Sequence, residues 1–436
     1  MREKLSLMYK LGEGSEKDVC NPEKVRTSLL RRQEVITNIL LRLPAKSLVI
    51  CTSVCKSWGS MIKNSSFIQA HLTINFNNLH GTHRLLLHGV SCRSYSSGFG
   101  HYQSIHGLVE EVYSLHYDNH VFDEYCKLGF QSPVADGKIY NECFRVVGIC
   151  NGLVFLADDL MRLGYNFIIW NPSIRKLVTL PKPGLRFQTV GGYNACHGFA
   201  FDAITNDYKV VRLVEDQRGC MVDSEDTANQ TFVEVYSLAA GSWSDPRFVD
   251  PQCKLNIGSP QAFVNGALHW DACNLTSSSC RYFILAFDVS SELFREMMMP
   301  KSLDLDLRRV LTLQLSVSGD GKSLALFMTK EEGSFLDIWV MTEYSVQESW
   351  TKLITLRPQG PVESLLRALC FRKSGEVVLE ISHGRYRGEK ARIELYSLDL
   401  ASGQLKALGI SRYHYYTMDT YEESIVLLDR NDAVSC

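Results

Sequence analysis

A weak internal repeat that begins near residue 143 constrains the fold of this chain more than any other feature. Each unit carries an apolar, aromatic-rich run that leads through a polar turn into a second run, as in FIIWNPSIRKLVTLP and FVEVYSLAAGSWSDP. The aromatic position of the unit recurs at Trp170, Tyr236, Phe287, Trp339 and Tyr396. The spacing of about 50 to 65 residues is typical of the blades of a propeller.

The other half of each unit consists of two short apolar runs joined by a polar turn, for example GFAFDAITNDYKVVRLV and AFVNGALHWD. Their enrichment in β-branched and aromatic residues predicts paired strands. Sheets that repeat at this period bury both faces against their neighbours and leave only short edges, as in a β-propeller. We therefore predict a propeller over residues 141–436, with about six blades as the best count.

The two ends of the repeat decide how such a ring closes. Residues 76–140 are predicted to connect the repeat to the N-terminal part of the chain and to contain the first strands. The segment YYTMDTYEESIVLLD near the C-terminus is predicted to pair with strands near Leu85 and to close the ring.

A helical stretch near the N-terminus, residues 34–58, has a different period. Ile36, Ile39, Leu40 and Leu43 recur at offsets of three and four, which places them on one face of a helix. Pro44 ends that helix, and two further helical stretches follow. Three helices in about 45 residues bury too little of their own area to enclose this apolar surface. The surface is therefore covered either by the rest of the chain or by a partner.

Composition limits the classes of partner. Lysine and arginine number 46 against 48 acidic residues, and a net charge of -2 gives no footprint for nucleic acid or an anionic membrane. Residues 1–30 are mostly polar, lack the apolar core of a secretory signal and are predicted to form a flexible tail. No run approaches the roughly 20 apolar residues of a membrane span. We expect an intracellular protein of the cytoplasm and nucleus.

The cysteines and acidic pairs are the candidate ligands and catalysts. The 14 cysteines include no CxxC pair, which predicts reduced thiols and neither a metal site nor a cofactor. Cys196 and His197 precede GFAF, a context that favours the start of a strand. The sequence also contains two pairs of acidic residues without a companion histidine, which we expect to be solvated in loops rather than to act in acid–base catalysis: Asp158 with Asp159, and Asp304 with Asp306.

The segment SVSGDGKS, residues 316–323, ends like a phosphate-binding loop. That loop needs a glycine where this chain has Ser316, and the following LALFM predicts a strand where the loop needs a helix. Asp320 and Gly321 between apolar strands instead predict a tight hairpin turn. No GxSxG elbow or HExxH helix is present, so no catalytic residue is assigned.

The segments LLRLPAKSL, SVCKSW and MIKNSSFIQAHL resemble the F-box of plant F-box proteins. VVGICNGLVFL, IIWNPSIRKLVTLP and QAFVNGALHW resemble the F-box-associated, kelch-like domain of the plant family that includes S-locus F-box proteins. The resemblance implies an α+β multidomain chain, with a small helical F-box at residues 31–75 followed by a mainly β kelch-like propeller. Within this family we favour the defence-related branch over pollen recognition.

This resemblance implies the non-catalytic substrate-recognition subunit of a ubiquitin ligase. Its F-box would bind a Skp-family adaptor and through it a cullin, and its propeller would bind a target protein that the sequence does not identify. The adaptor-facing positions carried over from the family are Ile36, Ile39, Leu40, Leu43, Pro44, Leu48, Val54, Cys55 and Trp58.

Two other functions stay open at this point. A propeller enzyme would carry its site at the central channel, and a scaffold would act outside a ligase. The scaffold stays open because four residues depart from the usual family residues at their positions: Arg31, Arg32, Ile50 and Cys51.

Overall fold

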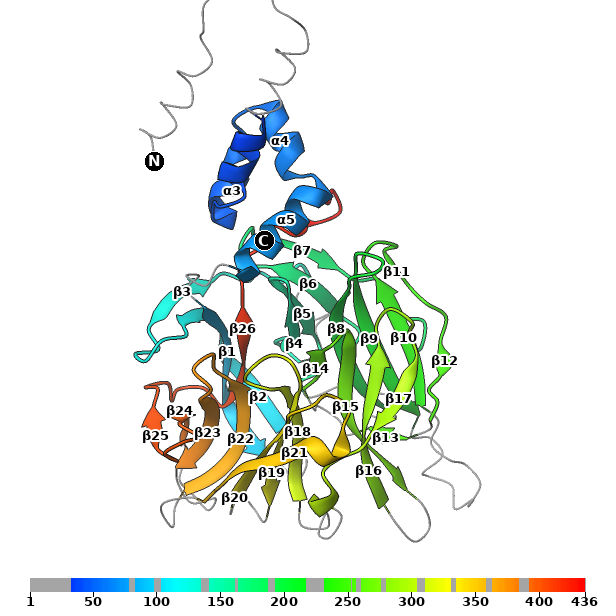
Figure 1. The fold of residues 1–436 in the computed structure, drawn as a ribbon, viewed down its shortest axis with the longest axis vertical. Coiled ribbons are helices and arrows are strands. Elements are labelled where there is room, and N and C mark those ends of the chain that lie inside the picture. The colour runs from blue at the N-terminus through cyan, green and yellow to red at the C-terminus, as the bar shows by residue number, and fades with distance from the viewer. Residues whose placement is uncertain are drawn as a thin grey trace, which may run out of the picture.

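In the computed structural model, short helices stand at one end of a ring of strands (Figure 1). The structure describes residues 33–77, 83–97, 103–134, 141–160, 164–186, 193–216, 231–251, 253–255, 260–275, 280–303, 310–330, 335–357, 363–383 and 392–435.

The helices confirm the predicted succession and add one more. Residues 33–40 are helical, and Pro44 stands at the N-cap of α3 (Ala45–Cys51), so the proline separates the two helices as expected. The Sγ atom of Cys55 accepts a hydrogen bond from the backbone N–H of Trp58 and caps α4 (Lys56–Ile62). The additional helix, α5 (Ser65–Asn77), follows directly.

The strands of the described residues form six sheets, and their order shows a propeller with six blades. Blade 1 contains β26 (Tyr415–Tyr421), β1 (Arg84–Ser97), β2 (Gln103–Tyr117) and β3 (Glu124–Leu128). Blade 2 contains β4 (Arg145–Cys150), β5 (Leu153–Ala157), β6 (Phe167–Asn171), β7 (Lys176–Thr179) and β27 (Val434–Ser435). Blade 3 contains β8 (Tyr193–Asp202), β9 (Asp207–Asp216), β10 (Thr231–Ser237), β11 (Ser242–Trp243) and β12 (Arg247–Phe248).

The other three blades continue the ring in chain order. Blade 4 contains β13 (Lys254–Leu255), β14 (Ala262–Val264), β15 (Ala267–Leu275), β16 (Cys280–Asp288) and β17 (Phe294–Met297). Blade 5 contains β18 (Val310–Val317), β19 (Leu324–Lys330), β20 (Phe335–Met341) and β21 (Trp350–Leu356), with the 3-10 turns η2 (Lys301–Leu303) and η4 (Gln347–Ser349) nearby in the chain. Blade 6 contains β22 (Glu363–Phe371), β23 (Val377–His383), β24 (Arg392–Leu398) and β25 (Leu405–Ala407).

The C-terminal segment closes the ring, as the sequence predicted. Strand β26 pairs antiparallel with β1, and Leu85 lies opposite Thr420. The last strand, β27, then pairs with the outer strand β7 of blade 2. Because β1, β2 and β3 complete a blade with β26, the segment before residue 141 contributes one full sheet to the propeller.

The repeated aromatic position is confirmed as one structural site. Each of its five residues lies on the third strand of a blade, that is on β6, β10, β16, β20 and β24. The predicted hairpin at Asp320 and Gly321 joins β18 to β19, and Gly321 has a φ of +72°. The backbone N–H of Gly321 donates to the carbonyl of Ser318.

Apolar side chains fill the spaces between successive blades and make up the core. The cluster between blades 2 and 3 also includes the helical unit and the segment after β26. Leu72 of α5 and Ile425 belong to this cluster together with Leu153 of β5. Gln69 donates a hydrogen bond of 2.8 Å to Asn206 in the β8–β9 turn. The helices are therefore packed against the propeller through a shared core.

Two Asn-Gly turns with the same backbone geometry offer a matched pair of substitutions. Asn151 and Gly152 join β4 to β5, and Asn265 and Gly266 join β14 to β15, with positive φ at all four residues. A Cβ atom on Gly152 would lie 2.5 Å from the carbonyl oxygen of Glu422, whereas one on Gly266 would meet nothing within 4 Å.

We expect Gly266→Ala to lower the free energy of unfolding by about 1 kcal/mol, since alanine disfavours a left-handed backbone. Gly152→Ala should cost about 2 kcal/mol more, because the backbone of the C-terminal segment must also move. Thermal unfolding of the two purified variants measures the difference. Equal losses would show that the contact with Glu422 places no constraint on this turn.

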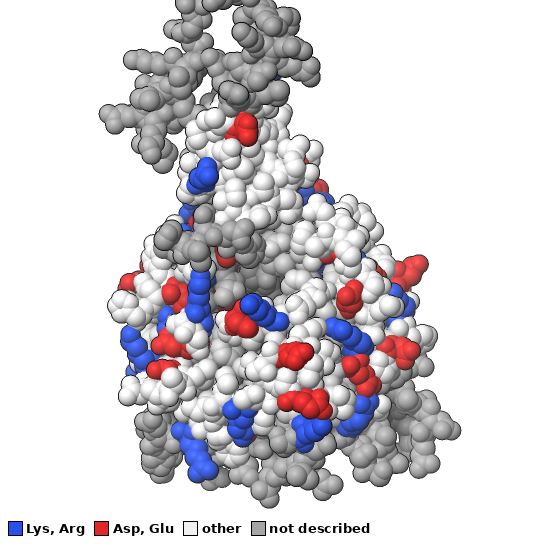
Figure 2. Space-filling model, in the orientation of Figure 1, with Lys and Arg blue, Asp and Glu red and all other residues white. Residues whose placement is uncertain are grey.

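Charged side chains of both signs are interspersed over the face of the propeller that Figure 2 shows.

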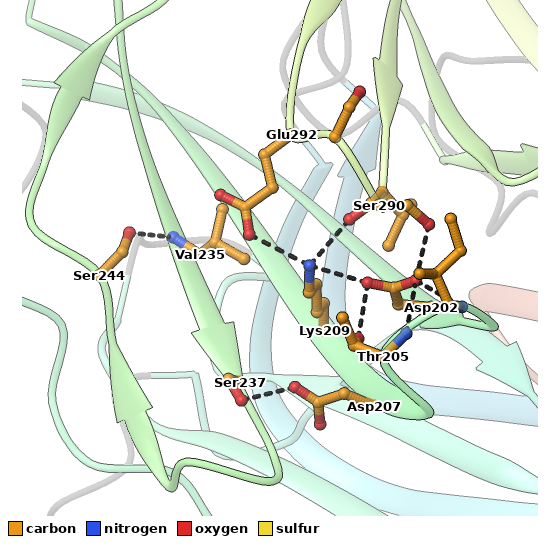
Figure 3. A network of polar contacts seen from close by, with 12 residues as sticks. Asp202, Thr205, Asp207, Lys209, Val235, Ser237, Ser244, Ser290 and Glu292 are labelled. Carbon is orange, nitrogen blue, oxygen red and sulfur yellow. Dashed lines mark hydrogen bonds and ion pairs between the residues drawn. The ribbon is translucent and has the colours of Figure 1, made fainter.

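Some charges are buried and join neighbouring blades. Lys209 on β9 is 7% exposed, and its Nζ lies 3.0 Å from Oδ2 of Asp202 and 3.1 Å from Oε1 of Glu292 (Figure 3). The ammonium also donates to the carbonyl of Val289 at 2.9 Å. Because residues 289 and 292 lie between β16 and β17, the lysine ties blade 3 to blade 4.

Asp202 is held in its charged form by several donors. Burial by itself would raise the pKa of this carboxyl, but hydrogen bonds from Ser290, Thr205 and Lys209 bring the pKa below its usual range. We expect Lys209→Met to lower the free energy of unfolding by about 3 kcal/mol, because it leaves the buried carboxylate without its counter-charge. Thermal unfolding should show no comparable loss for Lys301→Met, since Lys301 pairs with Glu348 at the exposed surface. A similar small effect for both variants would contradict this assignment.

Candidate functional site

The nine residues predicted to face an adaptor occupy three different environments in the helical unit. Ile39 and Val54 are 42% and 46% exposed, and Pro44 and Cys55 are also exposed. The side chains of Ile36, Leu43 and Trp58 are partly buried against the shared core. Leu40 and Leu48 are fully buried, at 1% and 0% exposure.

Leu40 and Leu48 therefore hold the helices together. They belong to one cluster with Ala45, Cys51 and Ile62. The helical periodicity identified an apolar face, but it could not indicate which part of that face α5 and the propeller would cover. Adaptor contact by the nine residues stays a prediction.

Two exposed apolar residues of the same unit were not among the predicted positions. Val35 is 58% exposed and Ile50 is 67% exposed. Val35 precedes Ile39 by four residues, so the two side chains lie on the same side of the helix. That spacing was the available signal in the sequence. We call Val35, Ile39, Ile50 and Val54 the exposed apolar set.

Few charged side chains cover the helical unit in the view of Figure 2. Exposed large apolar side chains on a small unit indicate a surface that a partner covers, because each one gains roughly 1.5–3 kcal/mol when it leaves water. The geometry thus fits an apolar contact with another protein.

A second candidate site is a cavity of about 600 Å³ in the centre of the ring. Its walls come from the inner strands β26, β4, β14, β18 and β22 and from the turns that follow β18 and β22. Gln261, just before β14, separates the cavity from β8. Its side-chain amide donates to the carbonyl of Phe199 at 2.9 Å and accepts from the N–H of the same residue. A Cβ atom on Gly148 would collide with this amide.

Three arginines line the cavity, and each is paired with a carboxylate. The guanidinium of Arg84 lies 2.9 Å from Glu423, that of Arg367 lies 2.6 Å from Glu380, and that of Arg372 lies 2.8 Å from Asp118. Within the described residues, three further carboxylates of the wall have no ion pair: Asp320, Asp419 and Glu422. Asp320 accepts hydrogen bonds from the hydroxyl of Ser318 and the backbone N–H of Lys322.

Two acidic side chains outside the cavity, Asp158 and Asp159, form structural hydrogen bonds and ion pairs. The sequence predicts that Asp158 and Asp159 are solvated, and this is wrong. Asp159 lies 2.6 Å from Arg145 and 3.0 Å from His197. Burial by itself would raise the pKa of Asp159, but Arg145 and His197 hold this pKa well below its usual range. Asp158 accepts hydrogen bonds from Asn141 and Asn166. These partners come from neighbouring strands and loops, so the local sequence did not reveal them.

The other candidate ligands give no metal-binding geometry in the part of the chain that the structure describes, where no three His, Cys, Asp or Glu side chains gather around a common point. Cys196 and His197 lie on β8, which confirms the predicted strand, and burial raises the pKa of the Cys196 thiol. The pair Asp304 and Asp306 lies outside the described residues. No helix among the described residues is long and apolar enough to span a bilayer.

The comparisons with known proteins agree on both parts of the chain. Residues 33–69 match the family model of the F-box domain, and residues 108–386 match that of the F-box associated beta propeller domain. An F-box/kelch-repeat protein of Arabidopsis thaliana is 28% identical over 368 residues, which cover 81% of this chain and 88% of the relative. The F-box protein CPR1 of the same plant is 25% identical over 418 residues, which cover 92% of this chain and 89% of the relative.

Proposed function

Because this chain belongs to the F-box proteins that carry an F-box-associated β-propeller, we propose that it is the substrate-recognition subunit of a Skp–cullin–F-box ubiquitin ligase. The F-box binds a Skp-type adaptor, and the propeller binds the target protein. The observation that supports adaptor binding is the exposed apolar set, which stays exposed although the other apolar side chains of the helical unit pack into the shared core.

The chemistry of such a subunit is positioning. A bound target lysine near the ubiquitin-carrying thioester reacts at a raised effective concentration, and the subunit needs no catalytic side chain for this. The shared core between the F-box and blades 2 and 3 favours a fixed distance between adaptor and target. We propose that the protein acts in the cytoplasm and nucleus.

The direct test is complex formation between the purified full-length chain and a plant Skp-type adaptor. Size-exclusion chromatography with light scattering should show a one-to-one complex, and addition of the cullin should give a three-protein assembly. A folded chain that does not bind the adaptor at micromolar concentrations would overturn the proposal and favour a scaffold outside the ligase.

A further inference from the structure

The central cavity has the size of a binding site and walls of mixed character. About 600 Å³ is enough for a long side chain or a small molecule. Phe263, Phe371 and Met418 contribute apolar surface to the wall, and Gln314 contributes a side-chain amide. An elongated group with an apolar stem and a polar end would match such a lining.

The three arginines of the wall are already used within the chain, and the ammonium of Lys373, which also lines the cavity, contacts the ring of His83. Besides their carboxylate partners, Arg367 donates to the carbonyl of Tyr416 and Arg372 donates to that of Asn119. Arg372 also lies 2.7 Å from Glu376. An anionic ligand would have to compete with these bonds, and it would face the carboxylates of Asp419 and Glu422 as well.

The two acidic side chains on and after β26, Asp419 and Glu422, have no ion pair within the described residues. Asp419 lines the cavity, and within the described residues it accepts hydrogen bonds only from its neighbour Thr420. Surrounding protein raises the pKa of Asp419 to about 6, because nearby charges do not compensate the lost water. The Oε2 atom of Glu422 is buried without a hydrogen bond in the described residues. Burial raises the pKa of Glu422 too, and Lys373 opposes this only in part.

We propose that this cavity binds a cationic group, a protonated amine or a guanidinium on a slim chain, between the carboxylates of Asp419 and Glu422. The cation would supply a counter-charge to Asp419 and would add to the partial compensation that Lys373 gives Glu422, and the stem would lie against the apolar wall. The cationic group belongs either to a lysine or arginine side chain of the target or to a free polyamine. The inference rests on the proposed function only for the first of these sources.

The turns that line the opening of the central cavity place a bound group beside the F-box. The turns after β18 and β22 line the cavity and join the first to the second strand of their blades. The β8–β9 turn, which contacts Gln69 of the F-box, joins the first to the second strand of blade 3. Turns of this kind all lie at one end of a propeller, so the cavity opens toward the end that carries the F-box.

Isothermal titration calorimetry of the full-length chain tests the proposal with three probes: spermidine, a blocked pentapeptide with a central lysine, and the same peptide with norleucine. We expect the lysine peptide, spermidine or both to bind, and the norleucine peptide to bind at least tenfold more weakly. Binding of the lysine peptide alone would identify a target side chain as the source, and binding of spermidine alone would identify a free amine. Absence of binding by both cationic probes at millimolar concentration would overturn the proposal.

The double variant Asp419→Asn and Glu422→Gln should lose at least tenfold in affinity for the cationic probe. Asp245→Asn is the matched control, because Asp245 is exposed on blade 3 and does not line the cavity. The double variant should also unfold at a temperature no lower than the wild type, since neither carboxylate has an ion pair within the described residues. Unchanged affinity would overturn the proposal. Adaptor binding, measured separately, should be the same in all these variants, so the two proposals can fail independently.

Discussion

Deletion of residues 415–436 is expected to prevent the chain from folding to a soluble monomer. This deletion removes β26, the inner strand of blade 1, together with Tyr416, Tyr421 and Ile425, which are at most 2% exposed. It also uncovers the clusters between blades 6 and 1 and between blades 1 and 2. At roughly 1.5–3 kcal/mol for each buried large side chain, the loss approaches the whole stability of about 5–15 kcal/mol of a typical domain.

Expression in the soluble fraction, limited proteolysis and light scattering measure the effect. The matched control is removal of residues 434–436 alone, which deletes the short exposed strand β27 and leaves β26 in place. The control should remain folded. A truncated chain that stayed monomeric and resisted proteolysis would show that the other five blades hold the ring without closure by β26.

The strands of blades 2 to 6 could be predicted from the sequence because the patterns that indicate them are short and local. The spacing of Trp170, Tyr236 and the later aromatic residues identified a strand that is the third strand of blades 2 to 6. The polar turns between apolar runs identified the hairpins, since an Asp-Gly or Asn-Gly pair needs a positive φ at one or both residues. Closure by the C-terminal strand followed from the rule that a propeller leaves no long edges.

Blade 1 was harder to predict from the sequence because its strands come from the two ends of the propeller sequence. Strands β1 and β2 change register between Ser91 and Cys92, and Phe122 has a φ of +61°. The inner strand of this blade comes from the other end of the chain. A residue in such a blade therefore has its partners hundreds of positions away, as Arg372 and Asp118 illustrate.

The central cavity could not be predicted for the same reason. Its wall combines side chains from blades 1, 2, 4, 5 and 6, and no single segment carries a recognisable pattern. Asp419 follows two aromatic residues and a methionine within an ordinary strand, and its unmatched charge becomes visible only when the ring is assembled. The F-box could be predicted only in part, because the family motif identified the helical unit but did not indicate that Leu40 and Leu48 are buried inside it.

The double variant Ile39→Asp and Val54→Asp is expected to abolish adaptor binding while the chain stays folded. Both side chains belong to the exposed apolar set, so the free protein loses little when they become charged. In a complex each aspartate would replace an apolar contact and would have to give up its water. A loss of at least about 4 kcal/mol corresponds to about a thousandfold in Kd, which a pull-down or calorimetry with the purified adaptor detects.

Two further variants separate a contact from a structural effect. Ile204→Asp is the matched control, because Ile204 is 83% exposed on the β8–β9 turn of the propeller, and it should leave adaptor binding unchanged. Leu40→Asp should instead lower the thermal midpoint sharply, since Leu40 is 1% exposed inside the shared core. If the Ile39 and Val54 double variant still bound the adaptor with the affinity of the wild type, the adaptor would contact a different face of the F-box.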